Sequence, residues 1–129
     1  MGASYTFVGN VVRIDLEGNY PSEDAIKAFE RALEDPAFPA NARLIVDVRR
    51  SESLTQRRTE DLKMVVDFFA QKVGRVGGRG AILAASEFQV GLMRLTATYA
   101  ELREVEAMVF QTEDEAIRWL NRDLPGCDD

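Results

Sequence analysis

Apolar runs of strand length alternate with amphipathic stretches along most of this chain, and the alternation predicts its architecture. Two β-rich runs come first, at residues 5–8 and 11–16. They are separated by Gly9-Asn10, a pair that tolerates the positive φ angles of a tight two-residue turn. Every second residue of the second run is apolar, as expected of a strand that buries one face. These residues therefore predict a β-hairpin.

Three more strand-like runs follow, at residues 44–48, 81–85 and 105–110. The run at 44–48 is almost continuously apolar, which is typical of a central parallel strand covered on both faces. We therefore expect the apolar side chains of these strands to be mostly buried. The residues concerned are Leu44, Ile45, Val46, Ile82, Leu83, Val109 and Phe110.

Four stretches with apolar residues at three- and four-residue spacing predict helices after the second, third, fourth and fifth strands. The first of them starts near Ser22. The third starts at Ser86, which forms a predicted capping box with Gln89. The stripe expected to face inward on this third helix consists of Phe88, Leu92, Leu95, Tyr99 and Leu102.

The order of these elements predicts an α/β domain. Short connections between parallel strands require right-handed crossovers through the helices. The expected fold is a five-stranded, mostly parallel sheet, made of an N-terminal hairpin followed by β-α units, with four main helices. Only the first strand should be antiparallel, at or near an edge. At 129 residues, the chain fits a single domain over 1–129, with a core of about 4–121 and a flexible tail at 122–129.

Composition narrows the classes of function. The net charge is −6, and a general nucleic-acid binder needs a clustered cationic surplus, so we expect no nucleic-acid partner. No apolar run approaches the ~20 residues of a membrane-spanning helix. The first residues also lack the basic start and long apolar stretch of a secretory signal, so a cytoplasmic location is the expectation.

No pattern of catalytic or metal-binding residues accompanies the predicted fold. The chain has no histidine and one cysteine, Cys127, which has no evident base or metal partner. The glycine-rich segment 74–80 follows a helix and precedes a strand, which is the reverse of a phosphate-binding loop. Asp47 ends a strand as in a phosphate-accepting receiver domain, but the lysine that such a site needs after the last strand is missing. We therefore expect a non-enzymatic protein with no metal or other cofactor.

The segment after the third strand concentrates positive charge in an acidic chain. Four arginines and three hydroxyl residues lie within residues 49–58. A segment that leads from a parallel strand into a helix offers guanidinium groups, hydroxyls and free N–H groups to an anion. The alternative is a solvated loop whose arginines pair with Glu52, Glu60 or Asp61. The candidate binding residues are Arg49, Arg50, Ser51, Ser53, Thr55, Arg57 and Arg58.

Met64 and Phe68 form an i, i+4 pair that stands apart from the main apolar stripe of the next predicted helix. They are candidate apolar anchors for a partner beside the basic segment. If exposed, they are also a candidate contact between two copies in a two-fold homodimer. The alternative is that this helix is buried over more than one stripe, and the sequence leaves both interpretations open.

With this order of elements, the chain resembles the SpoIIAA-like branch of the STAS superfamily. The resemblance covers roughly residues 4–120 and rests on four segments: YTFVGNVVRIDLEGNY, RLIVDVRR, GAILAASE and VFQTEDEAIRWL. It implies β-α units whose helices lie largely on one side of the sheet. It also places residues 49–58 where anti-sigma-factor antagonists carry a phosphorylatable serine in an Asp-Ser-Ser/Ala-Gly setting. This segment has no Asp-Ser pair and no glycine, so the resemblance transfers that role to no single residue.

These patterns favour a regulatory module that binds a protein partner through residues 49–58 and the neighbouring helices. The alternative is a carrier of a small anionic or amphipathic ligand at the C-terminal ends of the strands, between residues 47–53 and 85–88. Related domains of the CRAL/TRIO type hold lipids in an apolar cavity. Those domains are larger than this chain, and no spare apolar helix is evident here to line such a cavity. We therefore expect no lipid cavity of that type.

Overall fold

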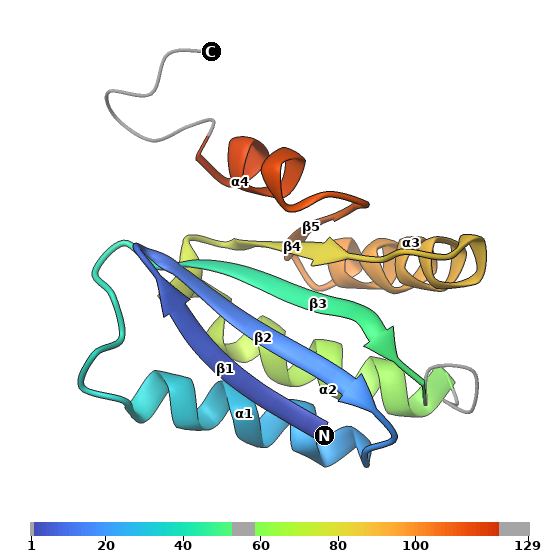
Figure 1. The fold of residues 1–129 in the computed structure, drawn as a ribbon, viewed down its shortest axis with the longest axis horizontal. Helices are drawn as coiled ribbons and strands as arrows, with labels where there is room; N and C mark the ends of the chain where they lie inside the picture. The colour runs from blue at the N-terminus through green and yellow to red at the C-terminus, as the bar shows by residue number, and fades with distance from the viewer. Residues whose placement is uncertain (1, 53–58, 122–129) are drawn as a thin grey trace.

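The computed structural model describes residues 2–52 and 59–121 (Figure 1). Within these residues the chain forms five strands and four α-helices, as its pattern predicts. The strands are β1 (Gly2–Val8), β2 (Val11–Gly18), β3 (Arg43–Ser51), β4 (Arg79–Leu83) and β5 (Glu106–Phe110). The helices are α1 (Ser22–Glu34), α2 (Thr59–Lys72), α3 (Glu87–Leu102) and α4 (Glu113–Asn121), with a short 3-10 helix, η2, at Val73–Val76. The predicted tail at 122–129 lies outside the described residues.

The five strands lie side by side in chain order, β1-β2-β3-β4-β5. β1 is antiparallel to β2 and forms one edge, whereas the other neighbours are parallel and β5 forms the opposite edge. Each parallel strand is added on the same side of its predecessor, so right-handed crossovers put α1, α2 and α3 on one face of the sheet. α4 follows the last strand and lies on the other face (Figure 1). The predicted α/β fold is therefore confirmed.

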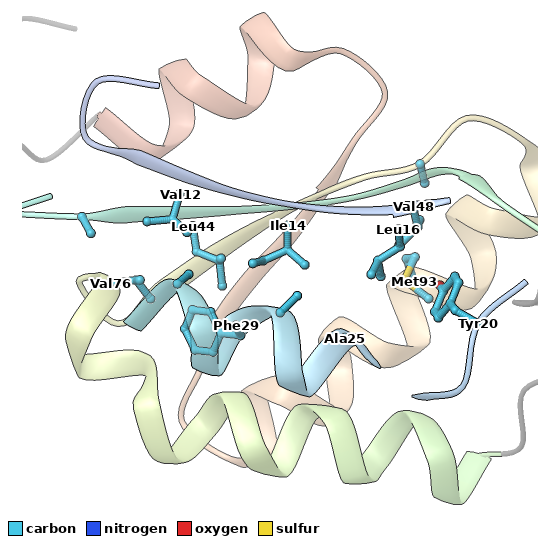
Figure 2. Close-up of a cluster of buried hydrophobic side chains, with 14 residues drawn as sticks. Val12, Ile14, Leu16, Tyr20, Ala25, Phe29, Leu44, Val48, Val76 and Met93 are labelled. Carbon is cyan, nitrogen blue, oxygen red and sulfur yellow. The ribbon is translucent and has the colours of Figure 1, made fainter. Parts of the chain in front are cut away.

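The face covered by α1 to α3 holds the larger hydrophobic core. The side chains of Val12, Ile14 and Leu16 alternate along β2 and point toward this face (Figure 2). Phe29 of α1 packs against them and is fully buried. Burying an apolar side chain of this size contributes about 1.5–3 kcal/mol.

The face covered by α4 holds a smaller and separate core. Ile45 of β3 and Leu83 of β4 are both fully buried against Leu120 and its neighbours on α4. The rings of Phe110 and Trp119 close this core at the β5 edge, with their centroids 5.6 Å apart. α4 therefore docks through apolar contacts with the central and outer strands.

Part of the predicted strand burial is confirmed and part is wrong. Leu44, Ile45 and Leu83 are buried, as expected. Val46 and Ile82 are only half-buried. Both of them border a cavity beneath the sheet, which leaves part of their surface accessible.

The strand β5 is also less covered than predicted. Val109 and Phe110 are half-buried rather than buried. The reason is topological, because β5 is an edge strand that has a neighbour on one side alone.

The predicted inner face of α3 is wrong for three of its five residues, whereas Leu92 and Tyr99 are half-buried and pack against the cores. Phe88, Leu95 and Leu102 expose 52%, 71% and 76% of their surface. The buried residues of this helix are instead Gln89, Met93, Ala97 and Ala100. Small residues allow α3 to lie close to β5, its main contact in the sheet, and this close approach turns the larger side chains outward. The predicted capping box of Ser86 and Gln89 is present.

Candidate functional site

An apolar cavity of about 110 Å³ lies between the sheet and the three helices α1, α2 and α3. Each of the three helices contributes several residues to the wall, among them Phe29 of α1, Phe69 of α2 and Met93 of α3. The sheet contributes others, among them Leu16 and Ile82. Native cores contain few voids larger than one water molecule, and a water takes up about 30 Å³ in the liquid. A space of this size is therefore large enough for a small organic molecule. The helices that line it are the predicted ones, and the sequence interpretation did not anticipate a cavity among them.

The position of α2 explains why this space exists. The contacts of α2 are mainly with α1 and α3 rather than with the strands. It therefore spans the two other helices at a distance from the sheet, as the lower part of Figure 2 shows. Val66 and Phe69 of α2 line the space, and the sheet contributes Gly80 and Ala107 to its lining, two small residues that fill little of it.

The polar atoms at the cavity lie mainly at one end, near the C-terminal ends of β2 and β3. Tyr20 and Ser22 are both buried there and line the cavity. The hydroxyl groups of Tyr20 and Ser51 form a hydrogen bond of 2.8 Å. Elsewhere, Thr96 lines the wall, and its hydroxyl donates to the carbonyl of Leu92 within α3. The cavity is thus almost wholly apolar, and the hydroxyl of its lining residue Tyr20 is bonded to Ser51, which is not among the lining residues.

A cluster of charged side chains lies on the opposite face of the sheet, beside the N-terminus of α4. Asp47 is at its centre, and its side chain is 8% exposed. Arg49 donates two hydrogen bonds to this carboxylate in a fork, at 3.0 and 2.8 Å. Arg13 donates to the same carboxylate at 2.9 Å and to Asp15 at 3.1 Å. Arg13 also forms an ion pair of 2.6 Å with Glu113, which links α4 to the sheet.

The charges of this cluster set the pKa values of its members. Burial by itself raises the pKa of Asp47, but the hydrogen bonds and charge of Arg49, together with the charge of Arg13, outweigh burial and lower this pKa. Burial lowers the pKa of Arg13, and its hydrogen bond to Asp15 with the charges of Asp15, Glu113 and Asp47 outweighs that effect and raises this pKa. Both groups are therefore held in their charged forms, which suits a structural ion pair rather than a proton-transfer residue.

The first three candidate residues of segment 49–58 all have partners within the chain. Arg49 is bound to Asp47, and Arg50 forms an ion pair of 2.9 Å with Glu17. Ser51 is buried and bonded to Tyr20. The pairing expected of a solvated loop is thus found for two arginines, although with acids of β2 and β3 rather than those named from the sequence. Ser53, Thr55, Arg57 and Arg58 lie outside the described residues.

The two apolar candidates on α2 have different environments. Met64 is 39% exposed. Phe68 is half-buried and packs edge-on against Phe29, with a centroid separation of 6.1 Å. Both line a shallow surface hollow between α1, α2 and α3, together with Ile26 and Tyr99. The pair is therefore part core and part surface, and homodimer formation through it stays a prediction.

The sequence interpretation missed the residues that line the cavity. Each of them belongs to an ordinary apolar stripe, and a stripe does not reveal how far two elements stand apart. One signal was available in the form of small residues. Gly80, Ala97 and Ala107 are all among the residues that line the cavity, and residues this small fill little of it.

No protein-family model and no curated protein sequence matches this chain. Among solved structures, it is similar to the crystal structure of an uncharacterized DUF3478-family protein with a SpoIIAA-like fold from Shewanella loihica PV-4. The TM-score is 0.57 at 17% sequence identity, and the match covers 92% of each chain. The chain has a SpoIIAA-like fold. The resemblance drawn from the sequence is confirmed at the level of the fold.

Membrane-spanning helices and metal-binding clusters are both absent from the described part of the SpoIIAA-like domain. In residues 2–52 and 59–121, no helix is both long and apolar enough to cross a lipid bilayer. Over the same residues, no group of three or more Cys, Asp or Glu side chains is arranged to hold a metal ion. The cavity and the surface hollow on α2 are the two candidate binding sites in the described part of the chain.

Proposed function

We propose that this protein is a non-catalytic binding protein that takes a small apolar ligand, or the apolar part of an amphipathic one, into the cavity beneath its sheet. The observation that carries the proposal is the 110 Å³ space with an almost wholly apolar wall. A cavity with few polar partners holds water poorly and accepts apolar molecules readily. The proposal takes up the carrier role that the sequence analysis gave as the alternative, but it moves the ligand from the strand ends into the core.

The chemistry of the wall also indicates which ligand class is preferred. The arginines near the strand ends, Arg13 and Arg49, belong to the ion cluster on the other face of the sheet. Among the described residues that line the cavity, none is a cation that could pair with an anion. The hydroxyl groups of the described lining residues belong to Tyr20, Ser22 and Thr96, and those of Tyr20 and Thr96 have partners within the chain. A short alcohol or a benzene-sized ring therefore fits better than a phosphate.

The test is a titration of the protein with benzene and with 1-hexanol, followed by NMR of methyl groups. Signals of Met93 and Val66, which line the cavity, should shift and saturate, whereas those of the exposed Val8 should not. Ligand that binds the native state alone raises stability by about 2.7 kcal/mol at a hundredfold excess over Kd. The melting temperature should therefore rise with each probe.

Two variants make this test specific. Ala97→Leu places extra carbon atoms in the cavity and should weaken the binding of both probes tenfold or more. Ala37→Leu, at an exposed position, is the matched control and should leave binding unchanged. Equal affinity of the wild type and Ala97→Leu for benzene would contradict the proposal.

A second candidate is a regulatory role in which the domain binds a protein partner through residues 49–58 and the adjacent helices. The hollow that exposes Met64 beside Phe68 supports it. Buried apolar side chains at the centre of an interface carry most of its binding energy. The partner would contact this hollow with an apolar side chain and would carry acidic groups for the arginines of segment 49–58.

This second candidate is tested by quantitative affinity capture with the wild type and three variants. A specific partner should be lost with Met64→Lys and retained with Val8→Lys, a matched change at another exposed apolar position. Its capture should also decrease with the double variant Arg57→Ala/Arg58→Ala and with rising salt, since exposed charges are screened within about 8 Å at physiological ionic strength. A protein captured equally by Met64→Lys and the wild type does not use this surface.

A further inference from the structure

The outward face of α3 carries the two most exposed large apolar side chains in the described part of the chain. Leu95 and Leu102 expose 71% and 76% of their surface, and Phe88 on the same helix exposes 52%. These residues are seven positions apart, which is about two helical turns, so they form one stripe along the helix. Contiguous exposed apolar surface on a soluble protein marks an interaction site.

Gly91 lies beside this stripe in the middle of α3, and the fold of the monomer does not require a glycine there. A Cβ atom at this position would meet no other atom within 4 Å. Its φ angle is not among the positive ones of the chain. Glycine inside a helix is destabilising relative to alanine. Gly91 therefore lowers the stability of the monomer, and no contact within the monomer compensates for this loss. With the exposed Thr98, it forms a strip of small side chains that a second helix can approach closely.

A third stripe on α3 is charged and lies on the far side of the small residues. It consists of Glu87, Arg94 and Glu101, each directly before a residue of the apolar stripe and therefore about 100° around the helix from it. All three are exposed. Among the residues that the structure describes, none of these three side chains forms an ion pair. Along the helix the signs alternate as negative, positive, negative.

We propose that this face of α3 binds the same face of a second copy of the chain, with the two helices antiparallel and the two-fold axis near Thr98. In this register Leu95 lies beside Leu102 of the partner subunit, and symmetry repeats the contact. Arg94 lies beside Glu101 of the partner subunit, again twice. Gly91 and Thr98 face the partner between the apolar and the charged contacts.

The two-fold symmetry itself selects the antiparallel arrangement. An axis perpendicular to both helices places the apolar stripes on the same side of the contact, and the charged stripes on the other side. An axis parallel to the helices would instead set the leucines of one copy against the charges of the other. The charged stripe of α3 is therefore complementary to the same stripe of a second copy when the two helices are antiparallel.

The strength of the contact follows from its size. α3 has 16 residues and is about 24 Å long at the usual rise per residue. A single pair of such helices buries less area than a standard stable interface, so the dimer should be weak, with a micromolar dissociation constant. Sedimentation from micromolar to millimolar concentration should therefore show the mass rise from 14.4 kDa toward twice that value.

Variants of the exposed stripes test the contact without disturbing the core. Leu95→Lys should weaken dimerisation at least tenfold. Arg94→Glu and Glu101→Arg should each weaken it, because each places like charges together at two symmetric positions. The double variant Arg94→Glu/Glu101→Arg should restore the wild-type dissociation constant, since it exchanges the two members of each pair. The melting temperature of every variant, measured on the monomer, should stay close to that of the wild type.

The matched controls are Val8→Lys and Met64→Lys, which change exposed apolar residues away from α3 and should leave dimerisation unchanged. A chain that stays monomeric at millimolar concentration overturns the proposal. So does a dimer that tolerates Leu95→Lys but dissociates with Met64→Lys, a result that would place the two-fold contact on α2. A double charge variant that is no better than the single ones overturns the antiparallel register.

Discussion

The two faces of the sheet are built from alternate residues of the same strands, yet they differ in how tightly they are packed. Beneath the sheet, α1, α2 and α3 enclose a large apolar core that retains a cavity of about 110 Å³. Above it, the short helix α4 covers a small core in which Ile45, Leu83 and Leu120 are fully buried. The number of helices on a face therefore does not determine its packing density.

The distance between the elements accounts for this difference. α4 contacts β4 and β5 directly, whereas α2 contacts the neighbouring helices rather than the strands. Beside the apolar contacts of α4, the upper face carries charges, with Asp47 held between Arg13 and Arg49. One face thus combines tight packing with ion pairs, and the other is mostly apolar and incompletely filled.

The largest effect is expected from truncating a leucine on the tightly packed face. Leu83→Ala should reduce the free energy of unfolding by about 2–5 kcal/mol. Leu44→Ala, on the face that already contains the cavity, should cost less, because part of the Leu44 surface borders empty space and makes no contacts there. Urea unfolding of both variants measures the difference. A larger loss for Leu44→Ala would show that the lower face is the better packed one.

The next largest effect is expected at the centre of the ion cluster. Asp47→Asn keeps the shape of the side chain but removes the charge that Arg49 and Arg13 contact. Hydrogen bonds to charged groups contribute about 1.5–3 kcal/mol, and we expect a loss of unfolding free energy in this range. Thermal unfolding at neutral pH measures it. A variant as stable as the wild type would mean that the cluster contributes to solubility rather than to stability.

The pH dependence of this stabilisation has a definite direction. The pKa of Asp47 is lower in the folded protein than its ordinary value, so the carboxylate binds its proton less readily when folded. Its contribution is fully present above the unfolded pKa of about 3.9, and it is lost as the pH falls through the lower folded pKa. The unfolding free energies of the wild type and Asp47→Asn should therefore converge in acid. Curves that stay parallel from neutral to acid pH would contradict this assignment.

The smallest effect is expected at the exposed ion pair on the same face. Arg50 and Glu17 are 2.9 Å apart, but their side chains are 74% and 42% exposed. Exposed pairs contribute about 0–1 kcal/mol, so Arg50→Ala should change the unfolding free energy by less than Asp47→Asn does. The same urea titration compares them. A loss for Arg50→Ala as large as that for Asp47→Asn would mean that burial does not distinguish the two pairs.

Local pattern was sufficient to predict the order and type of the elements. The Gly9-Asn10 turn, the alternation along β2 and the continuous apolar run of β3 each act within a few residues. Right-handed crossovers then determine the face on which α1 to α3 lie. The same pattern could not select the inner face of α3, since that helix has two apolar stripes. The small one, which includes Ala97 and Ala100, is buried because it allows closer packing on β5.

By itself, the sequence determined the five-stranded α/β architecture and the absence of any histidine-based site. The tertiary structure decided which side chains have partners, as it did when it joined Arg49 to Asp47 and Ser51 to Tyr20. It also decided that a cavity remains under the sheet and that Leu95 and Leu102 face outward. The physical reason is that periodicity records which face of an element is apolar, whereas voids, ion pairs and exposed stripes depend on distances between elements that are remote in the chain.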